Sequence, residues 1–574
     1  MASLYPKKVN GKTYWYLREM ARVGGKPKMV SERYLGTAAD LAAAVQSAGE
    51  AAAPERTRHL AFGDVAAVWA TMRRLDVVGI IDDVAGGKVA GADTSTGTYL
   101  ALAALNRVVD PCSKRGFAKW WKTTAGDRFT KIGASALDHR RFWDAMHAVT
   151  SEELTEIETR ITTAMITEFD LDTSALALDM TNFATYIDTG NDKAPIAQRG
   201  KAKQKRADLR LVGLGLVVTR DGGVPLVSHA YAGNRPDVTQ FASVIDKLTG
   251  GYQRLLTRST RNDTGHQHRA AEVSVVFDAG QNSEANFAHL TKTGLGYIGS
   301  VPPSDQSDLL ALPASRRKPV DPERFGGLSA VETRRTIYGL DQRVILTHSP
   351  TLHDKQVRGL DQTLAKTGAR LDELAATLAR GATRRGRDKV ENEITGICHD
   401  PWARRVISWE LTGHTPAEHR LTWRIETRAR KKLETEVFGK RILITDRDDW
   451  PVAEVVAGYR SQSDAEFGFR QLKDPHAVSF SPMHHWTDHN IRVHTYTCVL
   501  ALQIAHLMRR QAEHAGLHLS VRALLADLAG IEETVLIYPS TGGRPKARRM
   551  LTETDTQQDK LIDIFNLQPL APRT

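Results

Sequence analysis

The spacing of hydrophobic and polar residues changes several times along the chain. Residues 1 to about 40 alternate apolar and polar positions around Gly-containing turns, which predicts a small antiparallel sheet. An Ala-rich helical stretch follows and ends in a Pro-containing linker near residue 56. Beyond it, apolar residues recur at helical spacing to about residue 170. We therefore expect a β-rich N-terminal domain with a helix (1–55) and a helical domain (56–172), either of which can contact DNA.

The pattern becomes strand-like at Ser174. The runs SALALDMTNFATYI, LRLVGLGLVVT and VPLVSHAYAG are typical of strands, and a helix, a strand, a second helix and the short strand LGYIGSVP follow. The order βββαβαβ is that of an RNase H-like core up to the element before its last catalytic helix. The apolar run VSVVF is typical of a buried parallel strand. We expect an α/β fold with a mixed sheet between flanking helices, and its first part is 173–301.

A long segment, 302–450, interrupts this core. Leucines at helical spacing predict two charged helices around the Arg-rich RGATRRGRDK, and RRVISWEL, HRLTWRIETRA and GKRILITD alternate like strands. The segment is therefore predicted to be an α/β insertion, helical first and β-rich later. Helices resume over 451–540 and complete the core, and the polar tail 541–574 is predicted to be flexible.

Composition limits the possible classes of protein. The chain has 574 residues, enough for about two to four domains. No apolar run of about 18 residues could span a bilayer, and the first residues lack the pattern of a signal peptide, so we expect a cytoplasmic, nucleoid-associated protein without a membrane partner. Three widely spaced cysteines, Cys112, Cys398 and Cys498, argue against a disulfide framework or a cysteine-rich zinc site.

Net charge favours a polyanionic partner. Lys and Arg outnumber Asp and Glu by 78 to 67, for a net charge of +11, and nucleic acid is the expected partner. The basic residues gather in four clusters that either track phosphates or are simply solvated: Lys201, Lys203, Lys205 and Arg206; Arg384, Arg385, Arg387 and Lys389; Arg428, Arg430, Lys431 and Lys432; Arg544, Lys546, Arg548 and Arg549. Arg107, Lys114 and their neighbours, interleaved with Trp120 and Trp121, either face DNA or belong to a helical bundle.

Three acids occupy positions that favour chemistry on phosphate. Asp179 follows the apolar run ALAL on the first strand, and Asp278 follows VSVVF where the chain turns into a helix capped near Asn282 or Ser283. Acids at the ends of neighbouring parallel strands converge at one edge of a sheet. Glu466 lies in the helical stretch YRSQSDAEFGFRQLK, where the spacing places Tyr459, Glu466, Arg470 and Lys473 on one face.

Three carboxylates around one point repel one another unless cations lie between them. They favour Mg²⁺ or Mn²⁺, and two ions are expected. Such a pair of ions can activate water or a 3′-hydroxyl and stabilise the leaving oxygen during displacement at phosphorus. Taken one at a time, each acid is better explained as a turn, cap or surface residue, and only the ordered set of three favours catalysis.

These motifs together resemble DDE transposases of bacterial insertion sequences, in the group with a tyrosine–arginine–glutamate–lysine signature. The resemblance rests on LDMTNF around Asp179, GNRPDVT at 233–239, DAGQNSEAN at 278–286 and the Tyr459–Lys473 stretch. It implies that Asp179, Asp278 and Glu466 are the catalytic, metal-binding acids. It also implies phosphate contacts by Tyr459, Arg460 or Arg470, and Lys473. Gln462 occupies the position where the common signature has arginine. The phosphate contact of that arginine is therefore assigned to Arg460 or Arg470.

The resemblance implies a function and partners. They are binding of terminal inverted repeats, metal-dependent DNA cleavage and strand transfer into target DNA, by a homodimer or larger assembly on DNA. It also implies a tryptophan in the insertion that stacks on a flipped base, and Trp402, Trp409 and Trp423 either do this or pack in the domain. The alternatives are an RNase H-like nuclease or resolvase, and a domesticated DNA-binding protein without catalysis.

Overall fold

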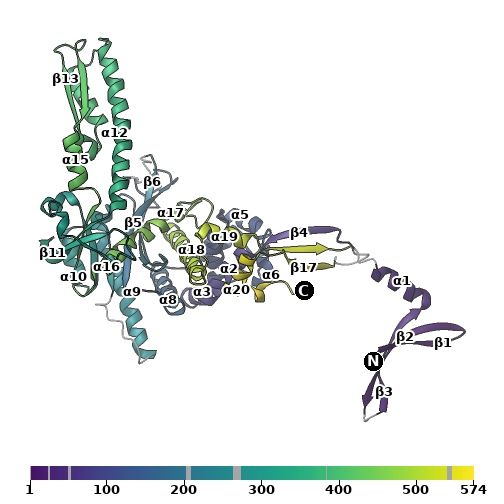
Figure 1. Cartoon of the computed structure of the whole chain (residues 1–574). Coiled ribbons are helices and arrows are strands. Elements are labelled where there is room, and N and C mark those ends of the chain that lie inside the picture. The colour runs from purple at the N-terminus through teal and green to yellow at the C-terminus, as the bar shows by residue number, and fades with distance from the viewer. Residues whose placement is uncertain are drawn as a thin grey trace. The chain divides into compact units, whose positions relative to one another are not determined.

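The computed structural model describes residues 2–23, 26–49, 53–201, 208–262, 273–382, 384–539 and 546–573. Two compact units make up the chain (Figure 1). The first contains Met1–Ala66, Thr123–Thr130 and Asp527–Thr574, and the second contains Ala67–Lys122 and Lys131–Ala526. None of the described helices combines the length and apolar character needed to cross a bilayer.

The first unit begins with the small antiparallel sheet that the sequence predicts. Its strands are β1 (Ala2–Val9), β2 (Lys12–Val23) and β3 (Lys26–Thr37), in the order β1-β2-β3, and α1 (Ala38–Gly49) follows. Asn10 and Gly11 join the first two strands with φ of 48° and 79°. An Asn-Gly pair with two positive φ angles makes the tight turn that matches the twist of a hairpin.

A second sheet of the first unit joins strands from both ends of the chain. Its order is β17 (Ala547–Leu551), β16 (Glu532–Ile537) and β4 (Arg56–Ala61), all antiparallel, and the unit also contains α6 (Gly126–Thr130) and α20 (Thr556–Ile564). The sequence predicts a flexible tail from residue 541. Residues 546–573 instead form a strand and a capped helix, with Leu561 in the helix and Leu567 after it both buried. This segment is mostly polar and has few apolar residues, so its sequence pattern did not predict that it packs.

Helices form a large part of the second unit. Buried side chains occur on all sides of α4, and α18 packs against α4, α7 and α8. The helices that flank or belong to this bundle are α2 (Gly63–Arg74), α3 (Val77–Ala85), α4 (Thr96–Val109), α5 (Lys114–Trp121), α7 (His139–His147), α8 (Ser151–Phe169), α18 (Asp488–His514) and α19 (Val521–Ala529).

A nine-stranded mixed sheet forms the centre of the second unit. Its order is β10-β11-β12-β15-β9-β8-β5-β6-β7, and only the β5/β8 and β8/β9 pairs are parallel. The strands are β5 (Ala175–Thr185), β6 (Arg210–Thr219), β7 (Pro225–Ala232), β8 (Ser274–Val276), β9 (Gly296–Val301), β10 (Lys318–Pro319), β11 (Ser329–Ile337), β12 (Leu340–His348) and β15 (Lys440–Thr445). The predicted succession βββαβαβ is confirmed for residues 175–301.

Helices cover both faces of this sheet. On one face lie α9 (Phe241–Asn262) and α10 (Glu284–Thr291), whose Phe241 and Phe287 pack on Phe277 at ring distances of 5.0 and 5.7 Å. On the other lie α16 (Val452–Arg460) and α17 (Gln462–Leu472), which pack on β5. Ser283 caps α10 by accepting a hydrogen bond from the Asn286 amide, which confirms one of the two predicted caps.

The segment predicted as an insertion has two parts. Its strands β10, β11, β12 and β15 extend the central sheet, while residues 350–438 form an arm with its own hydrophobic core. The arm contains α12 (Pro350–Ala379), α13 (Arg387–Ile397), α14 (Pro401–Val406), β13 (Ile407–Thr412), β14 (Arg420–Ile425) and α15 (Thr427–Glu436), and α11 (Ser307–Leu310) precedes it. The run RRVISWEL is therefore part helix, because Asp400 caps α14 before the strand begins.

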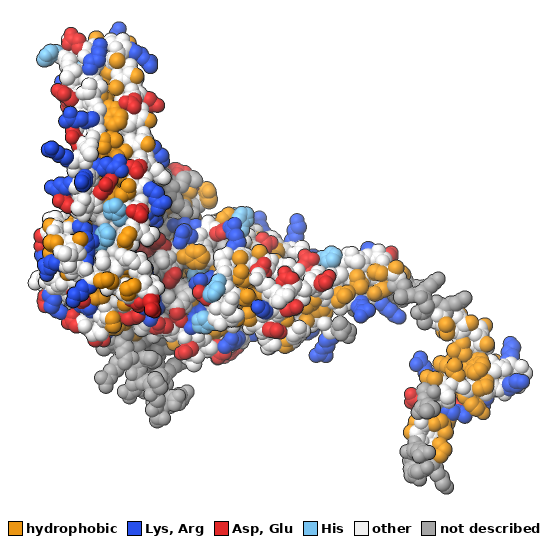
Figure 2. All heavy atoms as spheres, viewed as in Figure 1, with side chains coloured by type: hydrophobic (Ala, Val, Ile, Leu, Met, Phe, Trp, Pro, Cys, Tyr) orange, Lys and Arg blue, Asp and Glu red, His pale blue; other side chains and the backbone are white. Residues whose placement is uncertain are grey.

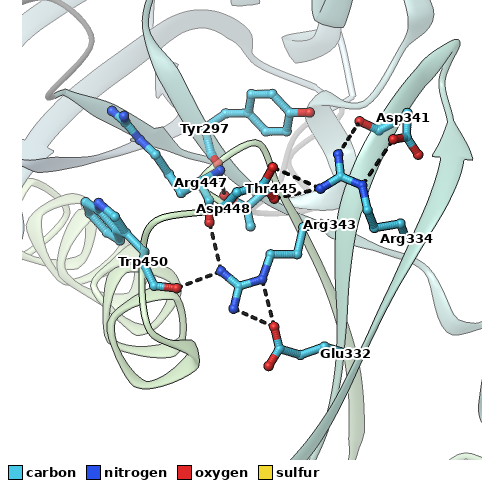
Figure 3. A network of polar contacts seen from close by, with 9 residues as sticks. All are labelled: Tyr297, Glu332, Arg334, Asp341, Arg343, Thr445, Arg447, Asp448 and Trp450. Carbon is cyan, nitrogen blue, oxygen red and sulfur yellow. Dashed lines mark hydrogen bonds and ion pairs between the residues drawn. The ribbon is translucent and has the colours of Figure 1, made fainter.

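A polar network fixes the loop that leads into α16 (Figure 3). Arg343 on β12 donates to the backbone oxygens of Arg447 and Trp450 at 2.8 and 2.6 Å. Arg334 on β11 holds both carboxylate oxygens of Asp448 at 2.7 and 2.9 Å. Strands of the insertion thus anchor the start of the helix that carries Tyr459.

Candidate active site

Asp179 and Asp278 occupy equivalent places on adjacent parallel strands. Ala177 of β5 pairs with Val276 of β8, and each aspartate lies two residues further along its chain. Neighbouring strands run about 4.8 Å apart. The two acids therefore lie side by side at one level of the sheet, as their positions after apolar strand runs predict.

The two aspartates also face the same side of the sheet. Phe277 packs on α9 and α10, so its neighbour Asp278 points to the opposite face because side chains alternate along extended backbone. On β5, Thr181 accepts a hydrogen bond from Lys473 of α17, and Asp179 shares its face at two residues' distance. Both acids therefore lie on the face covered by α16 and α17.

Two hydroxyl groups orient Asp278. Ser300 on β9 donates to Asp278 Oδ1 at 3.0 Å, and the Tyr459 hydroxyl donates to the same oxygen at 3.3 Å. Tyr459 is only 7% exposed, and burial raises the pKa of its phenol above the usual value. Tyr459 thus remains a hydrogen-bond donor to Asp278, and its predicted contact with DNA phosphate stays a prediction. Sequence reasoning missed Ser300, although alternation along GYIGSV places it on this face.

Gly458 allows α16 to approach the sheet closely. A Cβ at this position would lie 2.8 Å from Ile298 Cδ1 and 3.8 Å from the Ala175 Cβ. The helix therefore packs directly on β5 and β9 beside the two aspartates. This close packing brings the Tyr459 hydroxyl within reach of Asp278.

The helical stretch around Glu466 consists of two successive helices with one residue between them. Helix α16 ends at Arg460 and α17 begins at Gln462. Ser461 between them keeps helical backbone angles, its amide donates to the Ala457 and Gly458 carbonyls, and its hydroxyl donates to the Gly458 carbonyl at 2.7 Å. Tyr459 points into the sheet, while Glu466 and Arg470 are exposed on a separate helix.

Among the described residues, no hydrogen bond or ion pair is recorded between Glu466 and the two aspartates. Its side chain is exposed on α17, and in the described parts of the chain no group of three or more His, Cys, Asp or Glu side chains is arranged to hold a metal ion. The donor chemistry of Asp179 and Asp278 fits a hard divalent ion, since both offer carboxylate oxygens. The pair fits such an ion, and Glu466 as its third ligand stays a prediction.

Lys473 lies beside the acidic pair. Its ammonium group donates to Thr181 Oγ1 at 2.8 Å and lies 5.4 Å from the centre of the Phe183 ring. Thr181 is two residues from Asp179 on the same strand face. A cation is therefore held next to the acids, on the helix face where the sequence predicts a phosphate contact.

The two candidate arginines are both exposed. The Arg460 guanidinium lies over the Phe325 ring at 4.5 Å, and the Arg470 guanidinium lies 5.7 Å from the Phe467 ring centre. Gln462, at the signature position of arginine, is buried at the start of α17. Arg460 lines a small pocket with Arg220 and Arg324, whereas Arg470 does not.

The remaining predicted DNA contacts are partly described. Lys201 is exposed, and its carbonyl accepts from the Asn182 amide at 3.1 Å; Lys203 and Arg206 lie outside the described residues. Arg107 and Lys114, considered for DNA, are buried instead. Arg107 donates to the carbonyls of Ser481 and Cys112, so it ties segments of the bundle together. Helical spacing alone did not separate inward-facing from outward-facing cations here.

The three tryptophans of the arm pack against its core. Trp409 and Trp423 lie opposite each other on β13 and β14, and the Trp423 indole donates to Asp372 at 2.8 Å. Trp402 contacts Phe438 at a ring distance of 4.8 Å. All three side chains are only partly buried, and stacking on a flipped base stays a prediction. Lys and Arg side chains are numerous on the visible surface of the arm (Figure 2).

Comparison with known proteins gives little further guidance. No family model matches the chain, and no curated protein is similar to it. Among solved structures, the chain is similar to a piggyBac transposase in a synaptic complex with hairpin DNA, with a TM-score of 0.33 and 8% identity, over 81% of this chain and 79% of that one. A likeness this distant carries no argument about family or mechanism.

Proposed function

We propose that this chain is a DDE-type DNA transposase of a bacterial insertion sequence, with an RNase H-like catalytic core. One observation carries the proposal: Asp179 and Asp278 lie at the same level of adjacent parallel strands, on the same face. The strand order β9-β8-β5-β6-β7, with three antiparallel strands followed by two parallel ones, supports the core assignment.

The acids would hold Mg²⁺ or Mn²⁺, with Glu466 as the third ligand. When bound, the ions activate water or a 3′-hydroxyl and stabilise the leaving oxygen. Ser300 and Tyr459 keep the Asp278 carboxylate turned towards the α16 and α17 face. Lys473 supplies positive charge beside Asp179, where a backbone phosphate would lie.

Glu466 is the acid that completes this site in the proposal. It lies on α17, and α17 packs on β5 next to Asp179. Repulsion between three carboxylates opposes their convergence until cations neutralise them. We therefore expect Glu466 to approach the aspartates only when ions and DNA are bound.

The expected substrates are the terminal inverted repeats and a target duplex, and a homodimer or larger assembly on DNA would pair the two ends. The runner-up is an RNase H-like nuclease or resolvase with the same acids. It would cleave without joining, so a product in which the 3′ end is linked to target DNA separates the two functions.

The test uses DNA that flanks the coding sequence as the end substrate. Purified full-length chain with Mg²⁺ should nick this DNA at the repeat boundary and join it to a plasmid. Asp179→Asn and Asp278→Asn should each abolish both steps while still binding the duplex. Asp192→Asn, an exposed aspartate elsewhere, is the matched control and should keep activity. Normal cutting by either site variant would refute the site.

A further inference from the structure

The N-terminal sheet has almost no interior of its own. Between residues 3 and 45, none of the side chains whose exposure is described is buried. Leu4, Val30 and Tyr34 are each more than half exposed. A three-stranded sheet gains its stability from covering an apolar face, and although α1 packs on β2 and β3, apolar side chains of this sheet remain exposed to a partner.

The charge of this sheet identifies the class of partner. Residues 2–37 contain eight Lys and Arg but only two acids. Both acids already have partners, since Arg18 pairs with Glu32 at 2.7 Å and the Ser31 hydroxyl donates to Glu19 at 3.0 Å. A second copy of such a basic surface would be repelled, whereas a polyanion would be attracted.

Lysines gather at one end of the sheet. Lys7 and Lys8 end β1, Lys12 begins β2, and the Asn10-Gly11 turn joins them. All three lysines are exposed, and no ion pair is recorded for them among the described residues. Both acids lie near the middle of β2 and β3, so the tip of the β1–β2 hairpin carries three of the eight basic residues and no acid.

Aromatic side chains continue this basic tip along one face. The Tyr34 ring lies 5.9 Å from Tyr14 and 5.3 Å from Tyr16, and Lys7 lies 5.8 Å from the Tyr16 ring centre. Hydrophobic side chains, with Lys and Arg at the margins, are visible on this part of the chain in Figure 2. Tyrosines combine apolar area with a hydroxyl donor, a pairing that suits the edges and backbone of nucleic acid.

We propose that the β1–β2 hairpin is a double-stranded DNA contact in which Lys7, Lys8 and Lys12 bind backbone phosphates. A two-stranded ribbon fits the major groove, which gives the hairpin a docking geometry on duplex DNA. The choice of DNA rests on the proposed function, but the contact is separate from the acids on the central sheet. Binding of DNA by the hairpin can therefore be measured without cleavage of the DNA.

The experiment measures how the affinity of the full chain for a labelled duplex falls with salt. Each lost phosphate contact reduces the slope of log K against log[salt] by about 0.9. The triple variant K7Q/K8Q/K12Q should therefore lower the slope by about 2 to 3 and weaken binding at low salt at least tenfold. The variant K7R/K8R/K12R keeps the charges and should bind like the wild type.

A matched control removes the same charge elsewhere. K88Q/K292Q/K560Q neutralises three exposed lysines outside the hairpin and should leave the slope unchanged. An unchanged slope for K7Q/K8Q/K12Q, or an equal loss for the control, overturns the proposal. So does tighter binding of the wild type to anionic phospholipid vesicles than to the duplex.

The two proposals fail in different ways. A chain that binds DNA through the hairpin but never cuts it refutes the transposase and leaves the hairpin contact standing. A chain that cuts end DNA, with K7Q/K8Q/K12Q showing the wild-type salt slope, refutes only the hairpin contact.

Discussion

The Tyr459 hydroxyl lies 3.3 Å from Asp278 Oδ1, and this bond joins α16 to the edge of the parallel strands. Ser300 donates to the same oxygen from the neighbouring strand. Both donors use Oδ1 of Asp278, and among the described residues no hydrogen bond is recorded to its Oδ2.

Removing the Tyr459 hydroxyl should affect the site more than the fold. Tyr459→Phe loses one hydrogen bond, worth about 1 kcal/mol of unfolding free energy. A less well oriented Asp278 should slow cleavage of end DNA by about tenfold. Single-turnover cleavage and thermal unfolding are the measurements. The matched control is Tyr186→Phe at a tyrosine that is 83% exposed, and equal rates for the two variants would refute the positioning role.

Gly458 should be intolerant of a side chain. Gly458→Ala places a Cβ 2.8 Å from the buried Ile298 Cδ1, which forces repacking worth about 1 to 3 kcal/mol. The control is Gly359→Ala on α12, where no atom lies within 4 Å. Both variants gain the same helix propensity, so their difference in unfolding free energy isolates the clash. Equal stabilities would contradict the close packing of α16.

Lys114 should make stability depend on pH above neutrality. Burial and the nearby Arg107 lower the pKa of this lysine to about 7. The unfolded chain, with its ordinary lysine pKa, binds more protons between pH 7 and 10, so stability should rise with pH there. The slope contributed by one group is at most about 1.4 kcal/mol per pH unit.

Lys114→Met should remove that slope. Comparing urea unfolding at pH 7 and 9 for this variant and the wild type gives the contribution directly. Lys119→Met, an exposed lysine on the same helix, should keep the wild-type slope. If the free energy of unfolding changes with pH equally for Lys114→Met and the wild type, burial does not lower the pKa of Lys114.

The C-terminal segment should be held by a buried ion-pair cluster. Glu533 has no exposed side-chain surface and pairs with Arg128 at 2.6 Å and with Arg549 at 2.5 Å. Glu533→Gln leaves two cations without a counter-charge and should cost about 2 to 4 kcal/mol. Limited proteolysis should then cut within residues 546–573. The half-exposed neighbour Glu532→Gln should change neither stability nor cleavage.

The hydrophobic pattern along the chain predicted the strands whose position depends on their own buried residues. Alternation and apolar runs located β5 to β9 and placed Asp179 and Asp278 together, because a strand's register follows its buried residues. The division of this stretch into α16 and α17 was not predicted, because Ser461 keeps helical backbone angles and the sequence there carries no stop signal. The hydrophobic periodicity does not predict contacts between segments that are distant in the sequence. Examples are the pairing of β4 with β16 and the hydrogen bond from Ser300 to Asp278.

The central claim is that Asp179 and Asp278 form one divalent-ion site. Mn²⁺ titration followed by electron paramagnetic resonance, with the full chain and end duplex, tests it directly. Wild type and Asp192→Asn should bind Mn²⁺ with the same affinity, whereas Asp179→Asn and Asp278→Asn should each weaken binding at least tenfold, about 1.4 kcal/mol. Wild-type Mn²⁺ affinity in either site variant would contradict the account.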